Sequence, residues 1–486
     1  MTSDSIPPNT DPSRHPESPR SDTTSTRRQV LTALGLTASV MLAAPSLLMA
    51  SDATPKPRLP SVRKPNGKVR FAAVGVGGMG SQHAEIAKYD DVELVGLCDV
   101  DQNILTEKAQ AQKARFPNLK TYRDYREMLN LEDIDALLIA TPDHMHAPIS
   151  LLAMSKGIHV YCEKPLTRTV WEARQVRKMA AAPGLATQMG NWGSASEVMR
   201  RSLEVLKSGI LGNVTDIHVW TNRPIWPQGL QRPAGSDPVP AHLDWELWQG
   251  VAPRRPYKNG AYHQFNWRAW HDYGAGAIGD IYCHTLDLPS RAYGLTDPSE
   301  IIAEVSDQMP ECYPVSGTIH YTFPARQNRG AIKVHWYEGK HRPPKDVIPD
   351  VVRSRGELPE EAGLIIAGDQ GVIFGDKMHG TSQFFALKGE SKLLAVGKHP
   401  ALGAIAKTLP RSPGHRREWI DAIKGGPAPF CAFDIGAQLT ETAALGCIAE
   451  RFPGKKLLWD SANMCFSNCP EARHLLKPTY PPGWTV

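Results

Sequence analysis

The chain has 486 residues, of which 41% are hydrophobic and 22% are charged, and its formal net charge is +5. This length is too great for a single core, so two domains are expected, and no basic run indicates nucleic acid as a partner. The eight cysteines are scattered without a CxxC pair, which argues against a zinc site. Cys98, Cys162 and Cys283 are predicted to be buried free thiols, whereas Cys465 and Cys469 could pair with each other.

The first 53 residues are typical of an export signal, and residues 54–67 of a proline-rich linker. Arg27 and Arg28 precede an apolar run at 31–50, and small residues such as Ala50 offer cleavage sites. A twin arginine favours the Tat route, which exports folded proteins. The protein is therefore expected in the periplasm or otherwise outside the cytoplasm. A Sec signal or an uncleaved anchor is the alternative. The run is short and interrupted, and no other stretch approaches the roughly 18 apolar residues of a span, so an integral membrane protein is not expected.

Residues 68–190 alternate between strand-like and helix-like segments. The expected strands cover 69–74, 92–98, 119–122, 136–140 and 158–161. The expected helices cover 79–88, 104–115, 146–156 and 170–181. Such alternation predicts an α/β Rossmann domain, in which a parallel sheet carries helices on both faces.

A glycine-rich fingerprint follows the first of these strands. It contains Gly75, Gly77, Gly78, Met79 and Gly80, and the next strand ends at an aspartate, Asp99. In a dinucleotide-binding turn, the glycines let the backbone approach the pyrophosphate, and the acid binds the adenosine ribose and repels a 2′-phosphate. NAD is therefore predicted as the cofactor, with NADP as the less favoured choice and a glycine turn without a ligand as the alternative.

Two later strand ends carry polar residues suited to the same site. The strand at 136–140 leads into Thr141, Pro142 and His146, and the strand at 158–161 leads into Glu163 and Lys164. Ligands bind beyond the carboxyl ends of parallel strands, so these five residues are predicted to face the nicotinamide end of the cofactor. Two histidines lie in the first loop, but no cysteine or carboxylate cluster accompanies them, so no metal is predicted.

From about residue 191 the pattern changes to strands without intervening helices. The expected strands are 213–220, 316–323, 331–336 and 363–374, and helices are expected at 414–423 and 438–449. Strands that follow each other in this way predict an α+β domain at 191–486 with a large, mostly antiparallel sheet.

Aromatic residues concentrate between positions 220 and 273. Tryptophan and tyrosine suit sugar rings but are also ordinary core residues, so most are expected to be structural and two or three to reach a pocket. The proline-rich insert at 224–256 is predicted to overhang that pocket. Arg268, His271 and Asp272 are candidate substrate contacts, because they lead directly into the segment that contains Asp280 and His284.

Four motifs in order resemble the glucose–fructose oxidoreductase / inositol dehydrogenase (Gfo/Idh/MocA) family. They are the GxGxxG turn, the ATPxxxH stretch at 140–146, the EKP at 163–165, and an Asp and a His four residues apart at 280 and 284. The resemblance implies that Lys164, Asp280 and His284 surround the reacting carbinol. In that arrangement His284 accepts the hydroxyl proton, Lys164 stabilises the developing alkoxide, and Asp280 orients the histidine or binds a neighbouring hydroxyl. A structural helix pair is the alternative for Asp280 and His284.

The resemblance implies an exported NAD-dependent oxidoreductase that acts on a hydroxyl of a sugar or sugar derivative. Because no free cofactor pool exists outside the cytoplasm, NAD is expected to stay tightly bound and to be recycled in place. Some members of the family oxidise a sugar only transiently, so a redox-neutral glycoside hydrolase or lyase is the alternative. A non-catalytic sugar-binding protein is a further alternative. Oligomers are common in the family, which makes a homo-oligomer an expectation without a subunit number.

Overall fold

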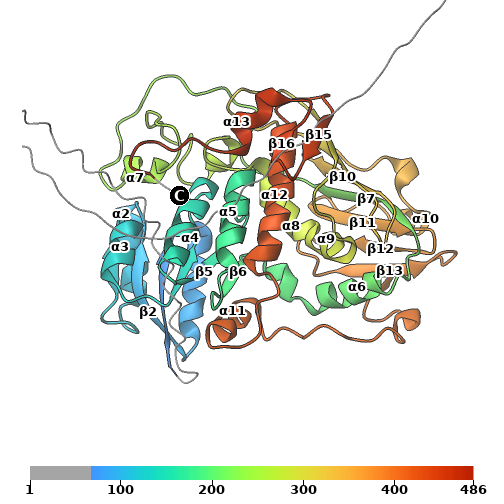
Figure 1. Cartoon of the computed structure of the whole chain (residues 1–486), viewed down its shortest axis with the longest axis horizontal. Coiled ribbons are helices and arrows are strands. Elements are labelled where there is room, and N and C mark those ends of the chain that lie inside the picture. The colour runs from blue at the N-terminus through green and yellow to red at the C-terminus, as the bar shows by residue number, and fades with distance from the viewer. Residues whose placement is uncertain (1–66, 485–486) are drawn as a thin grey trace, which may run out of the picture. The chain divides into compact units, whose positions relative to one another are not determined.

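The structure, a computed structural model, describes residues 67–484 (Figure 1). The predicted signal peptide with Arg27 and Arg28, and all of the predicted linker except Gly67, lie outside the described residues. Among the residues that are described, none of the helices has the length and apolar character needed to cross a membrane.

The first sheet is parallel throughout and has the strand order β3-β2-β1-β4-β5-β6. Its strands are β1 (Val69–Val74), β2 (Val92–Cys98), β3 (Lys120–Tyr122), β4 (Ala136–Ile139), β5 (His159–Cys162) and β6 (Thr187–Met189). The central strands β1, β4 and β5 are apolar runs with almost every residue buried, as a sheet covered on both faces requires. This strand order is that of dinucleotide-binding domains, and the predicted Rossmann fold is confirmed.

Five helices connect these strands. They are α1 (Gly78–His83), α2 (Gln102–Gln112), α3 (Tyr125–Leu131), α4 (His146–Ser155) and α5 (Val170–Ala180). A capping box fixes the start of α5, because the Thr169 side chain accepts from the backbone of Glu172 while the Glu172 carboxylate accepts from the backbone of Thr169. The single helix predicted at 79–88 is divided, since α1 ends at His83 and a 3₁₀ helix covers Ala84–Lys88.

The second sheet has ten strands in the order β14-β13-β12-β11-β7-β10-β9-β8-β15-β16. They are β7 (Val214–Thr221), β8 (Glu300–Val305), β9 (Gly317–Phe323), β10 (Ile332–Glu338), β11 (Ala362–Gly368), β12 (Gly371–Gly375), β13 (Gln383–Leu387), β14 (Leu394–Ala395), β15 (Leu457–Asp460) and β16 (Cys465–Phe466). Only β7 and β10 pair in parallel, so the predicted, mostly antiparallel sheet is confirmed.

One strand prediction in this sheet is wrong. The segment predicted as a single strand at 363–374 is a hairpin, in which β11 and β12 pair antiparallel with Ile366 opposite Ile373. The chain reverses at Asp369 and Gln370, which lie between two glycines, Gly368 and Gly371. Asp and Gly are turn-forming residues, and they override the apolar runs on either side.

The remaining α-helices of the described chain lie in the C-terminal part, after β6. They are α6 (Glu197–Lys207), α7 (Trp245–Gln249), α8 (Gly276–Thr285), α9 (Asp287–Tyr293), α10 (Asp350–Arg353), α11 (His415–Ile423), α12 (Phe433–Ala449) and α13 (Arg473–Leu476). Helix α12 packs against α5 on one side and α8 on the other (Figure 1). Helix α11 returns to the first sheet, where the Trp419 indole donates to the carbonyl of Ala186 over 3.1 Å. The C-terminal part of the chain therefore helps to cover the Rossmann sheet.

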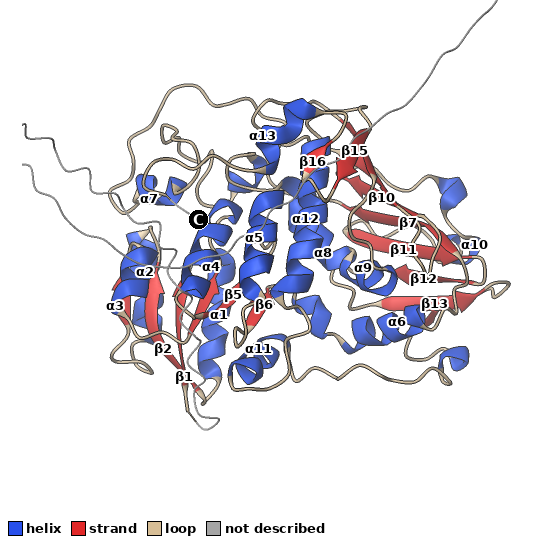
Figure 2. Ribbon diagram, in the orientation of Figure 1, coloured by secondary structure: helices blue, strands red, loops and turns tan. Residues whose placement is uncertain are grey.

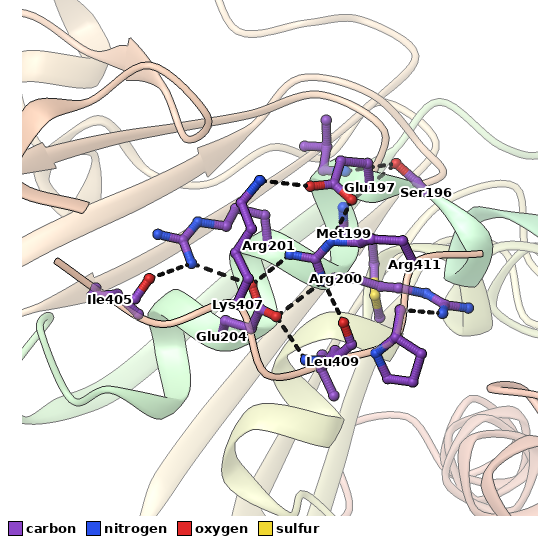
Figure 3. A network of polar contacts seen from close by, with 12 residues as sticks. Ser196, Glu197, Met199, Arg200, Arg201, Glu204, Ile405, Lys407, Leu409 and Arg411 are labelled. Carbon is purple, nitrogen blue, oxygen red and sulfur yellow. Dashed lines mark hydrogen bonds and ion pairs between the residues drawn. The ribbon is translucent and has the colours of Figure 1, made fainter. Parts of the chain in front are cut away.

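A buried polar network holds α6 in place (Figure 3). The Glu204 carboxylate, which is almost fully buried, accepts from the backbone of Leu409 and from both Nη atoms of Arg411. Arg201 lies 3.2 Å from the same carboxylate and donates to the carbonyl of Ile405 over 2.9 Å. Because α6 follows directly on the segment 190–196, this network anchors the residues at the carboxyl end of β6.

Candidate active site

A cavity of about 490 Å³ lies at the carboxyl ends of β1, β2, β4 and β5. Most of the residues predicted to bind the cofactor or substrate line it: Gly75, Gly77, Gly78, Met79, Asp99, Thr141, Pro142, His146, Glu163, Lys164 and Arg268. A larger cavity, of about 930 Å³, lies between the first sheet and the ends of α5, α11 and α12, and none of the predicted site residues lines it.

The glycine turn has the close packing that a dinucleotide site needs. Gly75 has φ +74°, and a Cβ there would lie 2.7 Å from the carbonyl of Ala140. A Cβ on Gly80 would lie 1.8 Å from the carbonyl oxygen of Gly75, so Gly80 closes the turn without lining the cavity. Within the part of the chain that the structure describes, a Cβ built on Gly78 meets no atom within 4 Å beyond its chain neighbours, which leaves this part of the backbone open. The turn therefore fits a pyrophosphate approaching its backbone.

Asp99 lies where the ribose of a bound dinucleotide is expected. One carboxylate oxygen accepts from the backbone N–H of Val76, in the glycine turn, over 2.8 Å. The other accepts from the backbone N–H of Asp101 over 3.0 Å. Each carboxylate oxygen has a second lone pair, and the side chain lines the cavity, so Asp99 can hold the turn and still accept from a ligand hydroxyl.

His146 and Glu163 fix the loops at these strand ends as well as lining the cavity. The His146 ring nitrogens lie 2.7 Å from the carbonyl oxygen of Pro165 and 2.8 Å from that of Thr141, which joins the two loops. The buried Glu163 carboxylate lies 3.0 Å from His83 Nε2 on α1. His146 therefore fixes the loop after β4 relative to the Lys164 loop, and Glu163 fixes the Lys164 loop relative to α1.

Two residues of the insert at 224–256, Leu247 and Trp248, line the cavity. The insert is mostly loop around the short helix α7 (Figure 2), and it docks on the first domain where Asp244 N–H donates to the carbonyl of Val100 over 3.0 Å. Most of the aromatic residues of this region pack against one another in one cluster. Three of them, Trp248, Phe265 and Trp267, reach the cavity, in agreement with the expectation of two or three.

Lys164 and Asp280 form an ion pair beside the cavity. Lys164 Nζ lies 2.5 Å from Asp280 Oδ1 and donates to the Asp280 carbonyl over 3.0 Å. Burial alone would raise the pKa of the Asp280 carboxyl, but the Lys164 and Arg268 cations hold this pKa below its usual value. Asp280 is therefore ionised at neutral pH, and it fixes the position of the Lys164 ammonium.

His284 lies one turn further along α8 and has a defined tautomer. Its Nδ1 lies 2.9 Å from Asn191 Oδ1. The Asn191 amide nitrogen donates to Asp287 Oδ2 over 2.9 Å and to the Cys283 carbonyl over 2.8 Å, which leaves Asn191 Oδ1 to act as an acceptor. The neutral ring therefore carries its proton on Nδ1. No described residue hydrogen-bonds Nε2, whose lone pair is available to accept a proton.

The charge state of His284 follows from its surroundings. Burial lowers the pKa of the ring far below its usual value, and the Lys164 and Arg223 cations lower it further. The neighbouring ring of His379, whose centroid lies 4.2 Å away, has a pKa lowered to about 4, chiefly by burial. Both rings are therefore neutral at neutral pH, the form in which an imidazole can act as a base.

Two predicted substrate contacts do not line the cavity. His271 is buried, and its Nδ1 lies 3.3 Å from the carbonyl oxygen of Pro310. Its ring packs edge-on against the ring of Tyr313. Asp272 pairs with Arg255 in the aromatic cluster. Arg268, the third candidate, lines the cavity, and its Nε lies 3.5 Å from Asp280 Oδ1.

Sequence reasoning missed Asn191, Asp287, Arg223 and His379. A signal existed for the first two, because Asn191 follows the end of β6 and Asp287 lies three residues after His284. Arg223, just after β7, and His379, in the loop between β12 and β13, had none, since only the tertiary fold brings them to α8. Cys465 and Cys469, which could have paired, are free thiols.

The fold and the glycine turn define a protein with an NAD-binding Rossmann domain and a second, sheet-based domain. Residues 69–191 match the profile of the oxidoreductase family with an NAD-binding Rossmann fold, and residues 201–325 match the profile of that family's C-terminal alpha/beta domain. The chain belongs to the Gfo/Idh/MocA family.

Similar structures support the fold. The WlbA dehydrogenase from Bordetella pertussis, solved with NADH and UDP-GlcNAcA, has a TM-score of 0.55 and 16% identity, covering 81% of this chain and 98% of that one. Levoglucosan dehydrogenase, solved with NADH, has a TM-score of 0.53 and 17% identity, covering 80% of this chain and 98% of that one.

Curated relatives match a shorter part of the chain. An alpha-N-acetylgalactosaminidase of Shewanella oneidensis is 34% identical over 163 residues, and a glycosyl hydrolase family 109 protein of Shewanella pealeana is 33% identical over 162 residues. Each match covers 31% of this chain, and the chain spans 36% of the length of each relative.

Proposed function

We propose that this protein is an NAD-dependent oxidoreductase that acts on a hydroxyl of a sugar or sugar derivative, with a tightly held cofactor that is recycled in place. The observation that carries the proposal is the grouping of Lys164, Asp280 and a neutral His284 beside the cofactor cavity. The twin arginine at Arg27 and Arg28 supports export with the cofactor already bound.

The chemistry follows from the protonation states of these residues. A carbinol that is oxidised to a ketone loses its hydroxyl proton and a hydride from the same carbon. Bound NAD supplies the acceptor for that hydride. His284 Nε2 accepts the proton, and the Nδ1–H bond to Asn191 keeps the ring oriented while it becomes charged. Lys164 stabilises the negative charge that develops on the oxygen.

A redox-neutral glycosidase or lyase is the second candidate. It is favoured by the names of the curated relatives, an alpha-N-acetylgalactosaminidase and glycosyl hydrolase family 109 proteins. In such a reaction, oxidation of the carbinol two carbons from the anomeric carbon acidifies the C–H between them. Loss of that proton with departure of the anomeric substituent breaks the glycosidic bond, and return of the hydride makes the cycle redox-neutral. The same Lys164 and His284 serve both reactions, so the two candidates differ in the product. A non-catalytic sugar-binding protein would have no need of this set of residues.

The cofactor content of the purified protein is the first test. We expect denaturation of the exported protein to release nearly one NAD(H) per chain, because an enzyme without a surrounding cofactor pool depends on slow release. Nucleotide is measured by chromatography of the supernatant. A protein that is isolated empty and binds NAD only weakly would contradict the recycled cofactor.

The same holoenzyme then distinguishes the two reactions. It is incubated without added cofactor with a panel of glycosides, and with pairs of a sugar and a keto-sugar. Cleavage of a glycoside supports the hydrolase or lyase, whereas reduction of one sugar coupled to oxidation of another supports the oxidoreductase. The Lys164→Ala variant, loaded with NAD, is the control for contaminating glycosidases.

A further inference from the structure

The segment 477–484 follows α13 of the second domain and runs onto the first domain. It contains three prolines, Pro478, Pro481 and Pro482. Each proline fixes its own φ angle, so the segment has few conformations to lose when it docks. The backbone N–H of Trp484 donates to the carbonyl of Pro481 over 3.1 Å, which closes a turn. The segment is therefore stiff, and the turn sets the direction of its last described residue.

Two contacts dock the segment on the first turn of α5. The Tyr480 hydroxyl donates to Oε1 of the buried Glu172 carboxylate over 2.6 Å. The other oxygen of Glu172 accepts from the backbone N–H of Thr169 over 3.0 Å, so the docking contact leaves the helix cap intact. The Lys477 ammonium lies over the Trp171 ring, 4.8 Å from its centroid. The segment therefore reaches the first domain at a fixed position.

Trp484 lies at the far end of this segment and lines the cofactor cavity. The Arg126 guanidinium covers the indole at 4.4 Å from the ring centroid. The Asp124 carboxylate holds that guanidinium through Nε at 3.0 Å and Nη2 at 2.6 Å. A ring that served only to pack would be expected in the interior, whereas Trp484 is partly exposed and borders the cavity. Part of the indole is therefore available to a molecule in the cavity.

Trp484 borders the end of the cavity where the adenosine of a dinucleotide is expected. The predicted ribose acceptor, Asp99, follows β2, and its backbone N–H donates to the carbonyl of Tyr122, at the end of β3, over 3.1 Å. Asp124, which holds the arginine over the indole, comes two residues after Tyr122 and also lines the cavity. The strand that leads to Lys164, β5, is three strands away from β2. A dinucleotide lies across these strand ends, with its adenosine at the β2 side.

We propose that the segment 477–484 retains the cofactor by covering the adenosine half of bound NAD, with the Trp484 indole against the adenosine. An adenine base has a flat aromatic face, and stacking of a base on an aromatic side chain is a strong contact. Release of the dinucleotide then requires the segment to move, which breaks the contacts of Tyr480 and Arg126. The inference rests on the proposed function for the recycled cofactor, and it assigns the part of the chain that makes release slow.

The rate of cofactor release tests this proposal without turnover. The full-length protein is loaded with NADH and mixed with a large excess of NAD, and the fluorescence of bound NADH, excited at the nicotinamide, is followed as it decays. Trp484→Ala should release NADH at least about tenfold faster than the wild type, the effect of one lost stacking contact, and should bind NADH correspondingly more weakly. Trp484→Phe keeps an aromatic face, so its release rate should lie between the two. An unchanged rate in Trp484→Ala would overturn the proposal. Tighter binding of NADH would overturn it as well, because the indole would then compete with the adenosine.

Two further variants separate the segment from a general loosening of the fold. Tyr89→Ala removes another aromatic ring that lies under an arginine, with the Arg417 guanidinium 5.4 Å from its centroid. Tyr89 precedes β2, at the amino end of the sheet, and does not line the cavity, so this variant should release NADH at the wild-type rate. Tyr480→Phe removes the docking hydrogen bond and should speed release by less than Trp484→Ala does. Combined with Trp484→Ala it should add nothing, because Tyr480 acts by holding Trp484 in place. Full additivity of the two changes, or equally fast release from Tyr89→Ala, would contradict the role of the segment.

Failure of this proposal and failure of the proposed function give different results. The ratio of the release rates of Trp484→Ala and the wild type tests the segment whatever the absolute rate. Fast release from the wild type that becomes faster still in Trp484→Ala would contradict only the recycled cofactor. Slow release that is the same in both proteins would refute the segment alone.

Discussion

Replacing Lys164 by alanine is expected to lower turnover by at least about 10²–10⁴-fold. Replacing His284 by alanine is expected to lower turnover within the same range. Lys164→Ala removes the ammonium that Asp280 holds at 2.5 Å, and with it both alkoxide stabilisation and substrate placement. His284→Ala removes the proton acceptor. Lys164→Arg should not restore turnover, since the planar guanidinium of arginine cannot replace a compact ammonium. Turnover is measured on holoenzyme with the sugar that the panel identifies.

Three controls accompany this prediction. Both single variants should bind NAD normally, because the glycine turn and Asp99 are untouched. The double variant should be little worse than the worse single variant, since proton and hydride leave the same carbinol. Because the pKa of His284 is lowered, its ring stays neutral as the pH falls through 6.5, so activity should not decline there through this residue. Near-normal hydride transfer in His284→Ala would indicate another base. His379 is then the next candidate, because its ring lies 4.2 Å from that of His284, whereas the His271 ring packs against Tyr313.

Asp99→Ser is expected to weaken the binding of NAD at least about tenfold relative to that of NADP. The variant loses a charged hydrogen bond to the ribose, which contributes on the order of 1.5–3 kcal/mol, and it no longer repels a 2′-phosphate. Asp99 also accepts from the backbone of Val76, so the variant can loosen the glycine turn and weaken both nucleotides together. The ratio of the two affinities, measured by fluorescence titration of apo-protein, separates the ribose contact from this shared effect. An unchanged ratio would show that Asp99 does not select the cofactor.

Local patterns predicted the cofactor half of the chain well. Strand β1, the glycine turn and Asp99 lie within thirty-one residues of sequence, from Val69 to Asp99, and each depends on backbone geometry that only particular residues permit. The segment at 363–374 was harder, because apolar, buried residues run up to the turn at Asp369 and Gln370 from both sides.

The catalytic half needed the tertiary fold. Asp280 and His284 are spaced to share a helix face, which is visible in the sequence. Their partners come from three distant segments: Asn191 after β6, Arg223 after β7 and His379 between β12 and β13. His271 illustrates the converse, since it lies close to Asp280 in sequence but its ring packs against Tyr313. Of the three substrate candidates chosen by proximity in sequence, Arg268 lines the cavity, whereas His271 and Asp272 do not.

Isotope transfer from the substrate to the cofactor tests the central claim most directly. A substrate sugar that carries deuterium at one carbinol carbon at a time is mixed with an excess of NAD-loaded protein, the reaction is quenched within one turnover, and the nucleotide is analysed by mass spectrometry. If Lys164 and His284 serve the oxidation of a carbinol, deuterium from one position should be found on the nicotinamide of the wild-type protein and be absent in Lys164→Ala. Product formation with no deuterium on the nicotinamide from any position would contradict the account.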